Sequence, residues 1–381
     1  MTPLTSLQWE EGGQTHSASW HSENGIAPHK KIQIVDDTMT ADIAYRLACE
    51  GTAILWRGDF QNARQLLQAM ARRCDHKKSP KRPKPTQTTS SPKEAFNLHR
   101  LAQAQRARIL GMVLIEVGQD YVIHLKRAPD IQEACIETYG QFSEPFVVSL
   151  REIQALIGAH EWRKKGVPIA ALHANIHPHY GVFSPIRGEY LELIASAPLP
   201  STELAFDIGT GTGVIAALLA KRGVKKIVAT DQDSRALTCA RDNISRLKLE
   251  NQIQLEQTDM FPAGKAPLIV CNPPWLPAKP SSPIEYAIYD PENRMLLAFL
   301  NGLKDHLTKN GEGWLIMSDF AEHLGLRDPA MLPNMIGSAG LEVIEKLDIK
   351  PKHGKVMDTE DSLHEARKKE VTSLWRLKNG A

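Results

Sequence analysis

The chain has 381 residues, with 46 Lys and Arg against 44 Asp and Glu and a hydrophobic content of 42%. That length predicts two domains, and the composition is typical of a globular protein rather than a disordered or fibrous one. No apolar run reaches the length of a membrane span and the polar N-terminus lacks a signal-peptide core, so we expect no membrane partner. The five cysteines are scattered and never in C-x-x-C spacing, which favours a reducing, cytoplasmic location.

Residues 1–40 are polar and without a sustained period, which predicts a flexible N-terminal tail. Residues 41–165 are expected to form a smaller N-terminal α/β domain. Within it, the Pro-, Ser- and Lys-rich residues 76–92 are expected to be a flexible loop. The other expected elements are a helix over 40–50, a strand over 52–56, helices over 60–73 and 93–110, a hairpin of 112–117 with 121–125, and helices over 129–139 and 149–164.

Basic charge is concentrated in residues 57–110, which hold thirteen Lys and Arg against three Asp and Glu. Because each contact between a cation and a phosphate releases counterions, such a segment is suited to the backbone of a nucleic acid. Only Phe60 and Phe96 are interleaved with the charges, which favours phosphate contact over base reading. The alternative is a solvated linker between two helices.

Residues 204–220 indicate a short strand, a glycine-rich turn and an apolar helix. Gly209, Gly211 and Gly213 allow close approach of the backbone to a ligand and free the helix N-terminus, which indicates a nucleotide-type cofactor. A dinucleotide fingerprint fits poorly, because its last glycine falls on Val214 and the acidic Asp207 precedes the first glycine.

Two further acids follow strands in the same region. A strand over 226–231 ends in Asp231, whose carboxylate can accept hydrogen bonds from both hydroxyls of a ribose. A third strand closes at Thr258 and Asp259.

An apolar strand over 268–271 runs into Asn272, Pro273, Pro274 and Trp275. Two prolines after an asparagine end the strand in a rigid turn that presents the Asn272 amide and nearby carbonyls. These acceptors with an aromatic plate suit a flat –NH2 group, because the oxygens accept its hydrogens while Trp275 stacks on its plane. The expected target is an amide or a nucleobase amine. A proline turn beside a core tryptophan is the alternative.

With these motifs, residues 177–320 resemble a class I S-adenosylmethionine-dependent methyltransferase. They are most similar to the branch that methylates planar nitrogen: the release-factor glutamine methyltransferases, the ribosomal RNA guanine methyltransferases and the amino-methylating DNA enzymes. The resemblance implies that residues 166–381 form a doubly wound, Rossmann-like α/β domain with a seven-stranded sheet. Its last strands are expected near 313–317, 342–347 and 373–377.

The resemblance also implies roles for individual residues. Asp231 would hold the ribose of S-adenosylmethionine, Asp259 its adenine amine, and Asn272 with the Pro273 carbonyl the target nitrogen, on which Trp275 stacks beside Pro274. The methionine part of the cofactor would contact Asp207, Gly209, Thr210, Gly211 and Gly213, and Asn272 would border the cofactor as well as the target nitrogen.

The segment from Tyr180 to Tyr190 resembles the one that closes over the methionine end of the cofactor in these enzymes. Two departures concern the substrate. Trp275 stands where the glutamine enzymes carry Tyr, and a Phe-Ser-Pro-Ile-Arg run ending at Arg187 replaces their Pro-Arg pair.

The leading functional hypothesis is methyl transfer to an exocyclic amine of ribosomal or transfer RNA. The runner-up is methylation of a glutamine side-chain amide on a translation protein, and the third hypothesis is a non-catalytic protein that binds S-adenosylmethionine or nucleic acid. A methyl sulfonium is already an activated electrophile, so positioning is the main task and no metal is expected. The sequence does not predict an oligomeric state.

Three other features have simpler interpretations. His173, His177 and His179 lie close together, but Pro178 interrupts any helical pair and no carboxylate or thiol completes a metal set. Cys271 lies in an apolar strand, which predicts a buried structural thiol. Residues 290–294 are expected to cap the following helix, with a place at the substrate opening as the alternative.

Overall fold

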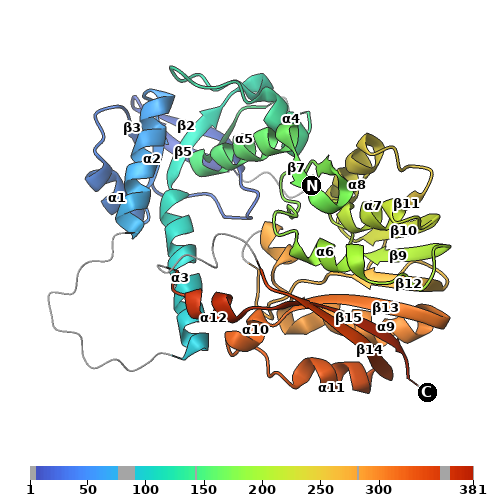
Figure 1. The fold of residues 1–381 in the computed structure, drawn as a ribbon. Helices are drawn as coiled ribbons and strands as arrows, with labels where there is room; N and C mark the ends of the chain where they lie inside the picture. The colour runs from blue at the N-terminus through green and yellow to red at the C-terminus, as the bar shows by residue number, and fades with distance from the viewer. Residues whose placement is uncertain (1–5, 76–90, 142–143, 281–282, 352–360, 381) are drawn as a thin grey trace. The chain divides into compact units, whose positions relative to one another are not determined.

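The computed structural model describes residues 6–75, 91–141, 144–280, 283–351 and 361–380 (Figure 1). Two compact units divide the chain: Met1–Thr89 with Leu98–Glu161, and Ser90–Asn97 with Trp162–Ala381. The sequence placed the start of the second domain at residue 166. The short segment from Ser90 to Asn97 was not expected in the second unit.

The first unit contains a sheet of strand order β1-β2-β6-β5-β4-β3. Its core gathers large side chains such as Trp56, Phe60 and Phe146, all fully buried. The strands are β1 Ser6–Glu11, β2 Gln14–His21, β3 Ile32–Val35, β4 Ala53–Trp56, β5 Val113–Val117 and β6 Phe146–Ser149. The helices are α1 Ala41–Cys49, α2 Phe60–Asp75, α3 Pro92–Leu110, α4 Gln132–Tyr139, α5 Leu150–Lys165 and the short η1 Gln119–Tyr121, although residues 92–97 of α3 and 162–165 of α5 belong to the second unit.

The predicted flexible tail over residues 1–40 is wrong for the residues that the structure describes. β1 and β2 form an antiparallel hairpin, in which Leu7 and Trp9 are buried, and β3 extends the other edge of the sheet. Gly12 and Gly13 connect the hairpin with φ of 59° and 78°, the left-handed backbone of a two-residue turn. This Gly-Gly pair between two runs of strand length was the signal of a hairpin.

The predicted hairpin of residues 112–117 with 121–125 is also wrong. β5 forms, but it pairs with β4 on one side and with β6 on the other. Residues after Gly118 enter the short helix η1, where Asp120 and Tyr121 have positive φ. Strands more distant along the chain therefore take both edges of β5. The predicted loop 76–92 lies outside the described residues up to 90, and Pro92 already belongs to α3.

The second unit is built on a sheet of order β11-β10-β9-β12-β13-β15-β14, with a separate small hairpin of β7 and β8. The strands are β7 Val167–Ile169, β8 Ala174–Ile176, β9 Leu204–Ile208, β10 Lys226–Asp231, β11 Ile253–Gln257, β12 Ala266–Cys271, β13 Leu307–Ser318, β14 Leu341–Ile349 and β15 Thr372–Asn379. The helices are α6 Glu189–Ser196, α7 Val214–Lys221, α8 Ser234–Arg246, α9 Arg294–His306, α10 Phe320–His323, α11 Met331–Ser338 and α12 His364–Lys369, with short turns η2 Ala170–Leu172, η3 Pro283–Ala287 and η4 Pro291–Asn293.

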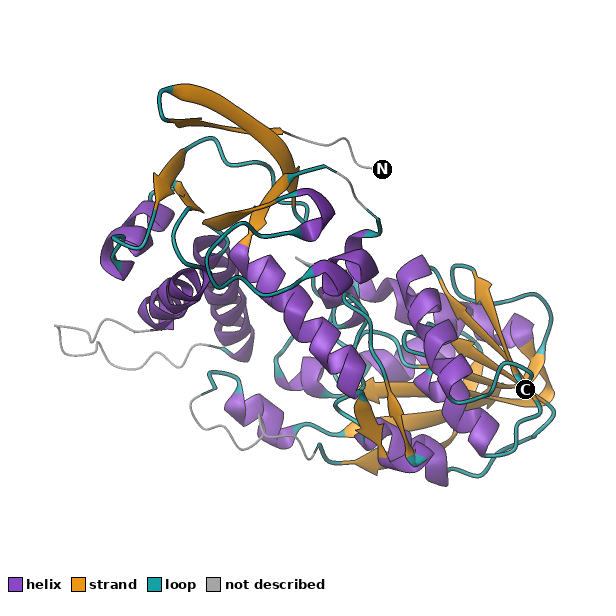
Figure 2. Ribbon diagram, turned by 90° about the horizontal axis from the view of Figure 1, so that it is seen from above, coloured by secondary structure: helices purple, strands orange, loops and turns teal. Residues whose placement is uncertain are grey.

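Helices cover both faces of this sheet, so its strands lie between two layers of helices (Figure 2). Because side chains alternate along a strand, neighbouring residues join opposite cores. Leu268 and Val270 pack with α6, α7 and α8, whereas Ile269 and Cys271 pack with α9 and α11. Burial on both faces explains why the strands are almost continuously apolar.

The strand order reverses direction at the centre of the sheet. β9 pairs in parallel with β10 on one side and with β12 on the other, while β15 runs antiparallel between β13 and β14. In open α/β sheets, ligands bind outside the carboxyl ends of the strands at such a reversal. The loops that follow β9 and β12 are therefore expected to form the functional site.

Candidate active site

Asp207 lies at the end of β9 and is fully buried. One carboxylate oxygen accepts hydrogen bonds from Thr210 Oγ1 at 2.6 Å and from the backbone N–H of Ala216 at 3.1 Å. The other oxygen, Oδ1, is buried without a hydrogen-bond partner. Burial raises the pKa of Asp207 to about 7. A buried acceptor left unpaired is costly, so this site is suited to a ligand that brings a donor, above all a cationic one.

The glycine loop between β9 and α7 takes a backbone that few other residues adopt. Gly209, Gly211 and Gly213 have φ of 71°, 56° and 80°. A Cβ on Gly211 would meet open space, so this glycine is required by its φ and not by crowding. The N–H of Gly211 donates to Asp231 Oδ2 at 3.0 Å, which ties the loop to the end of β10.

The three acids predicted from the sequence, Asp207, Asp231 and Asp259, do not share one environment. Burial raises the pKa of Asp231, as it does for Asp207. Asp259 differs, because its side chain is about half exposed and forms an ion pair with Arg294 at 2.6 Å. Asp259 therefore faces solvent with a basic partner, while the two other acids belong to the wall of the glycine loop.

Sequence reasoning missed Asn243, which is buried on α8. Its Oδ1 accepts from the N–H of His177 at 2.7 Å, and its Nδ2 donates to the carbonyls of His177 at 3.3 Å and Thr212 at 3.1 Å. One amide thus joins the glycine loop to the segment that precedes the first long strand. Its position, twelve residues after Asp231 on an amphipathic helix, carried no visible signal.

The turn after β12 is held by its own groups. Trp275 Nε1 donates to Asn272 Oδ1 at 3.0 Å, so the indole fixes the orientation of the amide. The carbonyl of Trp275 accepts from Arg327 Nη2 at 3.0 Å, and the guanidinium of Arg187 lies over the indole ring, 5.3 Å from its centroid. Trp275 is partly buried and packs against both cores of the unit. The amide and the aromatic plate are therefore preorganised together.

Arg327 is a second residue that the sequence did not reveal. Its side chain is almost fully buried, and it donates to Asn293 Oδ1 at 2.8 Å as well as to Trp275. Glu322 lies 3.5 Å away as its ionic partner. Burial lowers the pKa of Arg327, but an arginine still remains charged. This arginine connects the Asn-Pro-Pro-Trp turn to the start of α9.

The predicted cap before α9 is confirmed for Asp290. Its two carboxylate oxygens accept from the backbone N–H groups of Met295 and Leu296 at 3.0 and 3.1 Å. Asp290 is buried, and its N–H in turn donates to the carbonyl of Leu276 at 2.8 Å. The residue therefore fastens the end of the segment that follows Trp275.

The histidines bond to separate partners. His177 Nδ1 lies 2.6 Å from the carbonyl of Arg163, and His179 Nε2 lies 2.9 Å from Asp242 Oδ2. Within the described part of the chain, no group of three or more His, Cys, Asp or Glu could hold a metal ion. Cys271 is fully buried, as predicted, and burial raises the pKa of its thiol well above the usual range.

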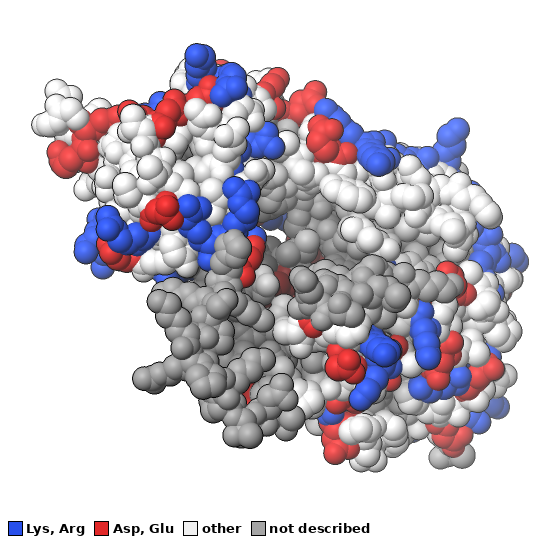
Figure 3. Space-filling model, turned by 60° about the vertical axis from the view of Figure 1, so that its left-hand side comes forward, with Lys and Arg blue, Asp and Glu red and all other residues white. Residues whose placement is uncertain are grey.

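The basic segment of residues 57–110 is partly neutralised in the structure. Arg57 pairs with Glu11 and Glu116, Arg73 with Asp42, and Arg106 with Asp75. On the face shown in Figure 3, the described Lys and Arg side chains alternate with acidic ones. Five of the thirteen basic residues lie outside the described ranges: Lys77, Lys78, Lys81, Arg82 and Lys84.

Each helix in the described ranges is too short or too polar to span a bilayer.

Comparison with known proteins assigns the second unit. Residues 174–327 match the family of the methyltransferase small domain. A protein of Methanocaldococcus jannaschii that carries a provisional N5-glutamine methyltransferase name is 30% identical over 161 residues, which cover 40% of this chain and 79% of that protein. The release factor glutamine methyltransferase of Streptococcus pneumoniae is 27% identical over 240 residues, covering 56% and 83%.

A transfer RNA enzyme and a solved structure are also similar to this chain. A tRNA1(Val) (adenine(37)-N6)-methyltransferase of Parabacteroides distasonis is 43% identical over 74 residues, which cover 18% of this chain and 31% of that enzyme. The solved structure of a methyltransferase from Pyrococcus furiosus superimposes with a TM-score of 0.39 and 21% identity, covering 58% of this chain and 98% of that one. The family match, the strand order and the glycine loop together show that this chain belongs to the class I methyltransferases that take S-adenosylmethionine as methyl donor.

Proposed function

We propose that this chain transfers the methyl group of S-adenosylmethionine to a planar –NH2 nitrogen, with the side-chain amide of a protein glutamine as the first candidate. The observation that carries the proposal is the fixed pairing of Asn272 with Trp275, 3.0 Å apart, directly after β12. β12 is the neighbour of β9, whose end carries Asp207. A cofactor loop and an acceptor turn therefore begin side by side on one edge of the sheet.

The cofactor fits the residues of the glycine loop. S-adenosylmethionine carries an ammonium group on its methionine part, and Asp207 Oδ1 is a buried acceptor that lacks a donor. Gly209, Thr210, Gly211 and Gly213 would surround that part of the cofactor. Asp231 would accept from the ribose, and Asp259 would lie toward the adenine amine at the more exposed end.

The acceptor turn would hold the nitrogen that receives the methyl group. The sulfonium of the bound cofactor supplies an activated methyl group, so the residues of the chain mainly have to align the nitrogen with it. Asn272 Oδ1 and the Pro273 carbonyl would accept the two hydrogens of the –NH2 group and stabilise charge as it develops on nitrogen. The indole N–H occupies one lone pair of Asn272 Oδ1 and leaves the other for the substrate. Pro274 stiffens the turn, and Trp275 provides the apolar plate.

Two observations favour a glutamine amide over a base. Two glutamine methyltransferases match this chain over 79% and 83% of their length and the tRNA enzyme over 31%, although two further release factor glutamine methyltransferases match over 31% and 38%. In addition, Arg57, Arg73 and Arg106 of the basic segment are already paired with carboxylates. Their charges are therefore only partly available for phosphates.

An exocyclic amine of ribosomal or transfer RNA is the second candidate, and the surplus of basic residues over 57–110 supports it. A purely non-catalytic binder of the cofactor is disfavoured. Such a protein would need the glycine loop, but it would have no use for an acceptor turn whose amide and indole are fixed beside it.

The decisive experiment incubates the protein with S-adenosylmethionine labelled in its methyl group and an extract of cells that lack the protein. We expect the label to enter a fraction that protease destroys and ribonuclease does not, and to appear as N5-methylglutamine after digestion. Asn272→Ala serves as the control for enzyme-dependent label. Label lost on ribonuclease treatment would replace the glutamine proposal by the RNA proposal, and no label in either fraction would contradict both.

The charge of the basic segment gives an independent check. Changing Lys77, Lys78, Lys81, Arg82 and Lys84 to Ser should leave methyl transfer to a protein substrate unchanged within about twofold. If the substrate is RNA, the same variant should bind it more weakly and with a shallower dependence on salt, by up to about one unit of log K against log salt for each lost phosphate contact.

A further inference from the structure

Arg187, in the segment before α6, contacts the acceptor turn that contains Asn272 and Trp275. Its guanidinium carbon lies 5.3 Å from the centroid of the Trp275 ring, within the range in which a planar cation is attracted to the face of an indole. The edge of the same ring is bonded to Asn272, and the Trp275 carbonyl is bonded to Arg327. Arg187 adds the contact on the face, which limits the tilt of the plate.

Arg187 is itself held by two buried carboxylates. Its Nη2 lies 2.9 Å from Glu370 Oε1, and its Nε donates to Glu189 Oε1 at 3.1 Å. The side chains of Glu189 and Glu370 are 5% and 0% exposed. Ser318 Oγ donates to the same oxygen of Glu370 at 2.7 Å. Because Ser318 ends β13, the neighbour of β12, this network stands at the same carboxyl edge as the acceptor turn.

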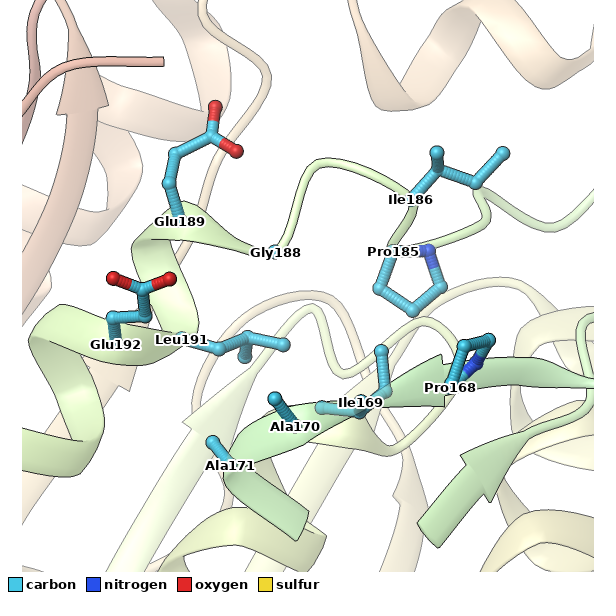
Figure 4. Close-up of a pocket in the computed structure, with 10 residues that line it drawn as sticks. All are labelled: Pro168, Ile169, Ala170, Ala171, Pro185, Ile186, Gly188, Glu189, Leu191 and Glu192. Carbon is cyan, nitrogen blue, oxygen red and sulfur yellow. The ribbon is translucent and has the colours of Figure 1, made fainter. Parts of the chain in front are cut away.

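The backbone that carries Arg187 runs between a pocket and solvent. A pocket of about 260 Å³ lies behind it, where Pro185 faces Ile169 and Leu191 across the hollow and the Glu189 carboxylate points away from it (Figure 4). The next residue, Ile186, is 62% exposed. Pro185 before it and Glu189 after it are buried, so the ion pairs of Arg187 hold the exposed part of the segment between two packed residues.

We propose that Arg187 is a positioning residue that sets the angle of Trp275, and that Glu189 and Glu370 act on the substrate site through it. This inference rests on the proposed function, because the plate matters for catalysis only if Trp275 stacks on the group that is methylated. Asn272 and Trp275 touch the substrate, whereas Arg187 acts through the indole. The positioning role depends on two residues of this chain, Arg187 at the end of its Ser-Pro-Ile-Arg run and Trp275 in the acceptor turn.

A double-mutant cycle tests the proposal. Arg187→Ala should lower the rate of labelled methyl transfer at limiting substrate about tenfold in the native background. In a Trp275→Leu background the same change should lower it less than twofold, because the ring through which Arg187 acts is gone. Cofactor affinity by calorimetry should stay within about twofold throughout. An equal tenfold loss in both backgrounds would overturn the proposal.

Lys346→Met is the matched control. Lys346 lies over the ring of Trp375, 5.1 Å from its centroid, so this variant removes a cation from a tryptophan outside the acceptor turn. It should leave the transfer rate unchanged. Because Arg187→Ala leaves two buried carboxylates without their cation and could fail to fold, the cycle is repeated with Glu370→Gln in every member. Arg187→Lys, which keeps a cation at the position, should recover part of the lost rate.

A second readout does not depend on any substrate. The difference between the fluorescence of the native protein and that of Trp275→Phe isolates the emission of Trp275. Arg187→Ala should increase quenching of that emission by acrylamide at least twofold, and Lys346→Met should not. If the native protein transfers no methyl group, the proposed function fails on its own, while the quenching still decides whether Arg187 holds the ring. Unchanged quenching contradicts that part of the proposal.

Discussion

The two loops at the carboxyl edge of the seven-stranded sheet differ in whether their buried polar groups have hydrogen-bond partners. The glycine loop keeps an acid, Asp207, in a fully buried place with one oxygen unpaired. The turn after β12 instead satisfies its groups internally, through Asn272, Trp275 and Arg327. The glycine loop has an unpaired acceptor until a ligand supplies a donor, whereas the amide and the indole of the acceptor turn are already held in place before a substrate binds.

This difference indicates where each loop should act in the reaction. An unpaired buried carboxylate contributes binding energy when its partner enters, so the glycine loop should control cofactor affinity. A rigid pair of acceptor and plate costs no reorganisation when charge develops on nitrogen, so the turn should control the rate of the chemical step. Variants in the two loops should therefore separate binding from turnover.

The largest expected effect is in the glycine loop. Asp207→Ala removes the acceptor for the ammonium group, and Gly211→Val places a β-branched residue at a φ of 56°, so both should weaken S-adenosylmethionine binding more than a hundredfold. Calorimetry with the cofactor and its demethylated product measures this, and thermal unfolding shows whether the fold is kept. Native affinity in two folded variants would remove the cofactor role of the loop.

The next effect is on turnover alone. Asn272→Ala should lower kcat by about a hundredfold or more and leave cofactor affinity close to that of the native protein, because the lost interaction is used mainly in the transition state. Trp275→Phe, which keeps an aromatic plate but no N–H for Asn272, should lose less. Turnover of Asn272→Ala within a few-fold of native would mean that the nitrogen is held elsewhere.

The sequence predicted the local structure of these two loops, because the bonds that form each loop are local. Asp207 bonds to Thr210 and Ala216, and Trp275 bonds to Asn272, so each motif contains its own partners. Parallel strands with burial on both faces give long apolar runs, which made the sheet of the second unit predictable as well.

The residues that were missed obtain their roles from distant segments. Asn243 reaches back 66 residues to His177, and Arg327 reaches back 52 residues to Trp275. Only the fold brings such pairs together, and no spacing of residues along the sequence predicts them. The N-terminal hairpin was missed for another reason, since β2 is largely exposed and polar and therefore lacks the apolar alternation of a half-buried strand.

A moderate effect is expected from pH. Burial raises the pKa of Asp207 to about 7 in the free protein, so below pH 7 the residue is neutral and attracts a cation less. The cofactor dissociation constant should rise up to about tenfold for each unit that the pH falls below 7, and it should be nearly constant just above 7. Calorimetry from pH 5.5 to 7.5 measures the slope.

The matched variant for this test is Asp207→Asn, which should bind weakly with little slope below pH 7. The stability of the free protein should depend on pH in the opposite direction from cofactor affinity. The folded state takes up a proton between the ordinary pKa of 3.8 and about 7 that the unfolded chain does not, so Asp207 destabilises the free protein more as the pH rises through that window. At pH 8 the Asn variant should unfold at a higher temperature than the native protein, and an equal or lower temperature contradicts the cost assigned to the buried acid.

The smallest effect sharpens the comparison by changing a residue that touches neither ligand. Asn243→Ala leaves the N–H and the carbonyl of His177 and the carbonyl of Thr212 without this partner, in a buried place. Unsatisfied buried groups of this kind cost about 1–3 kcal/mol each, and partial access of water reduces the sum to about 3 kcal/mol. Thermal unfolding should then begin about 6–12 °C lower. Thr238→Ala on the exposed side of the same helix should change the unfolding temperature little.

Because Thr212 belongs to the glycine loop and not to the acceptor turn, the Asn243 variant should lose cofactor affinity before it loses kcat. A loss of kcat with unchanged affinity would instead mean that α8 supports the acceptor turn, and the division of labour between the two loops would be wrong.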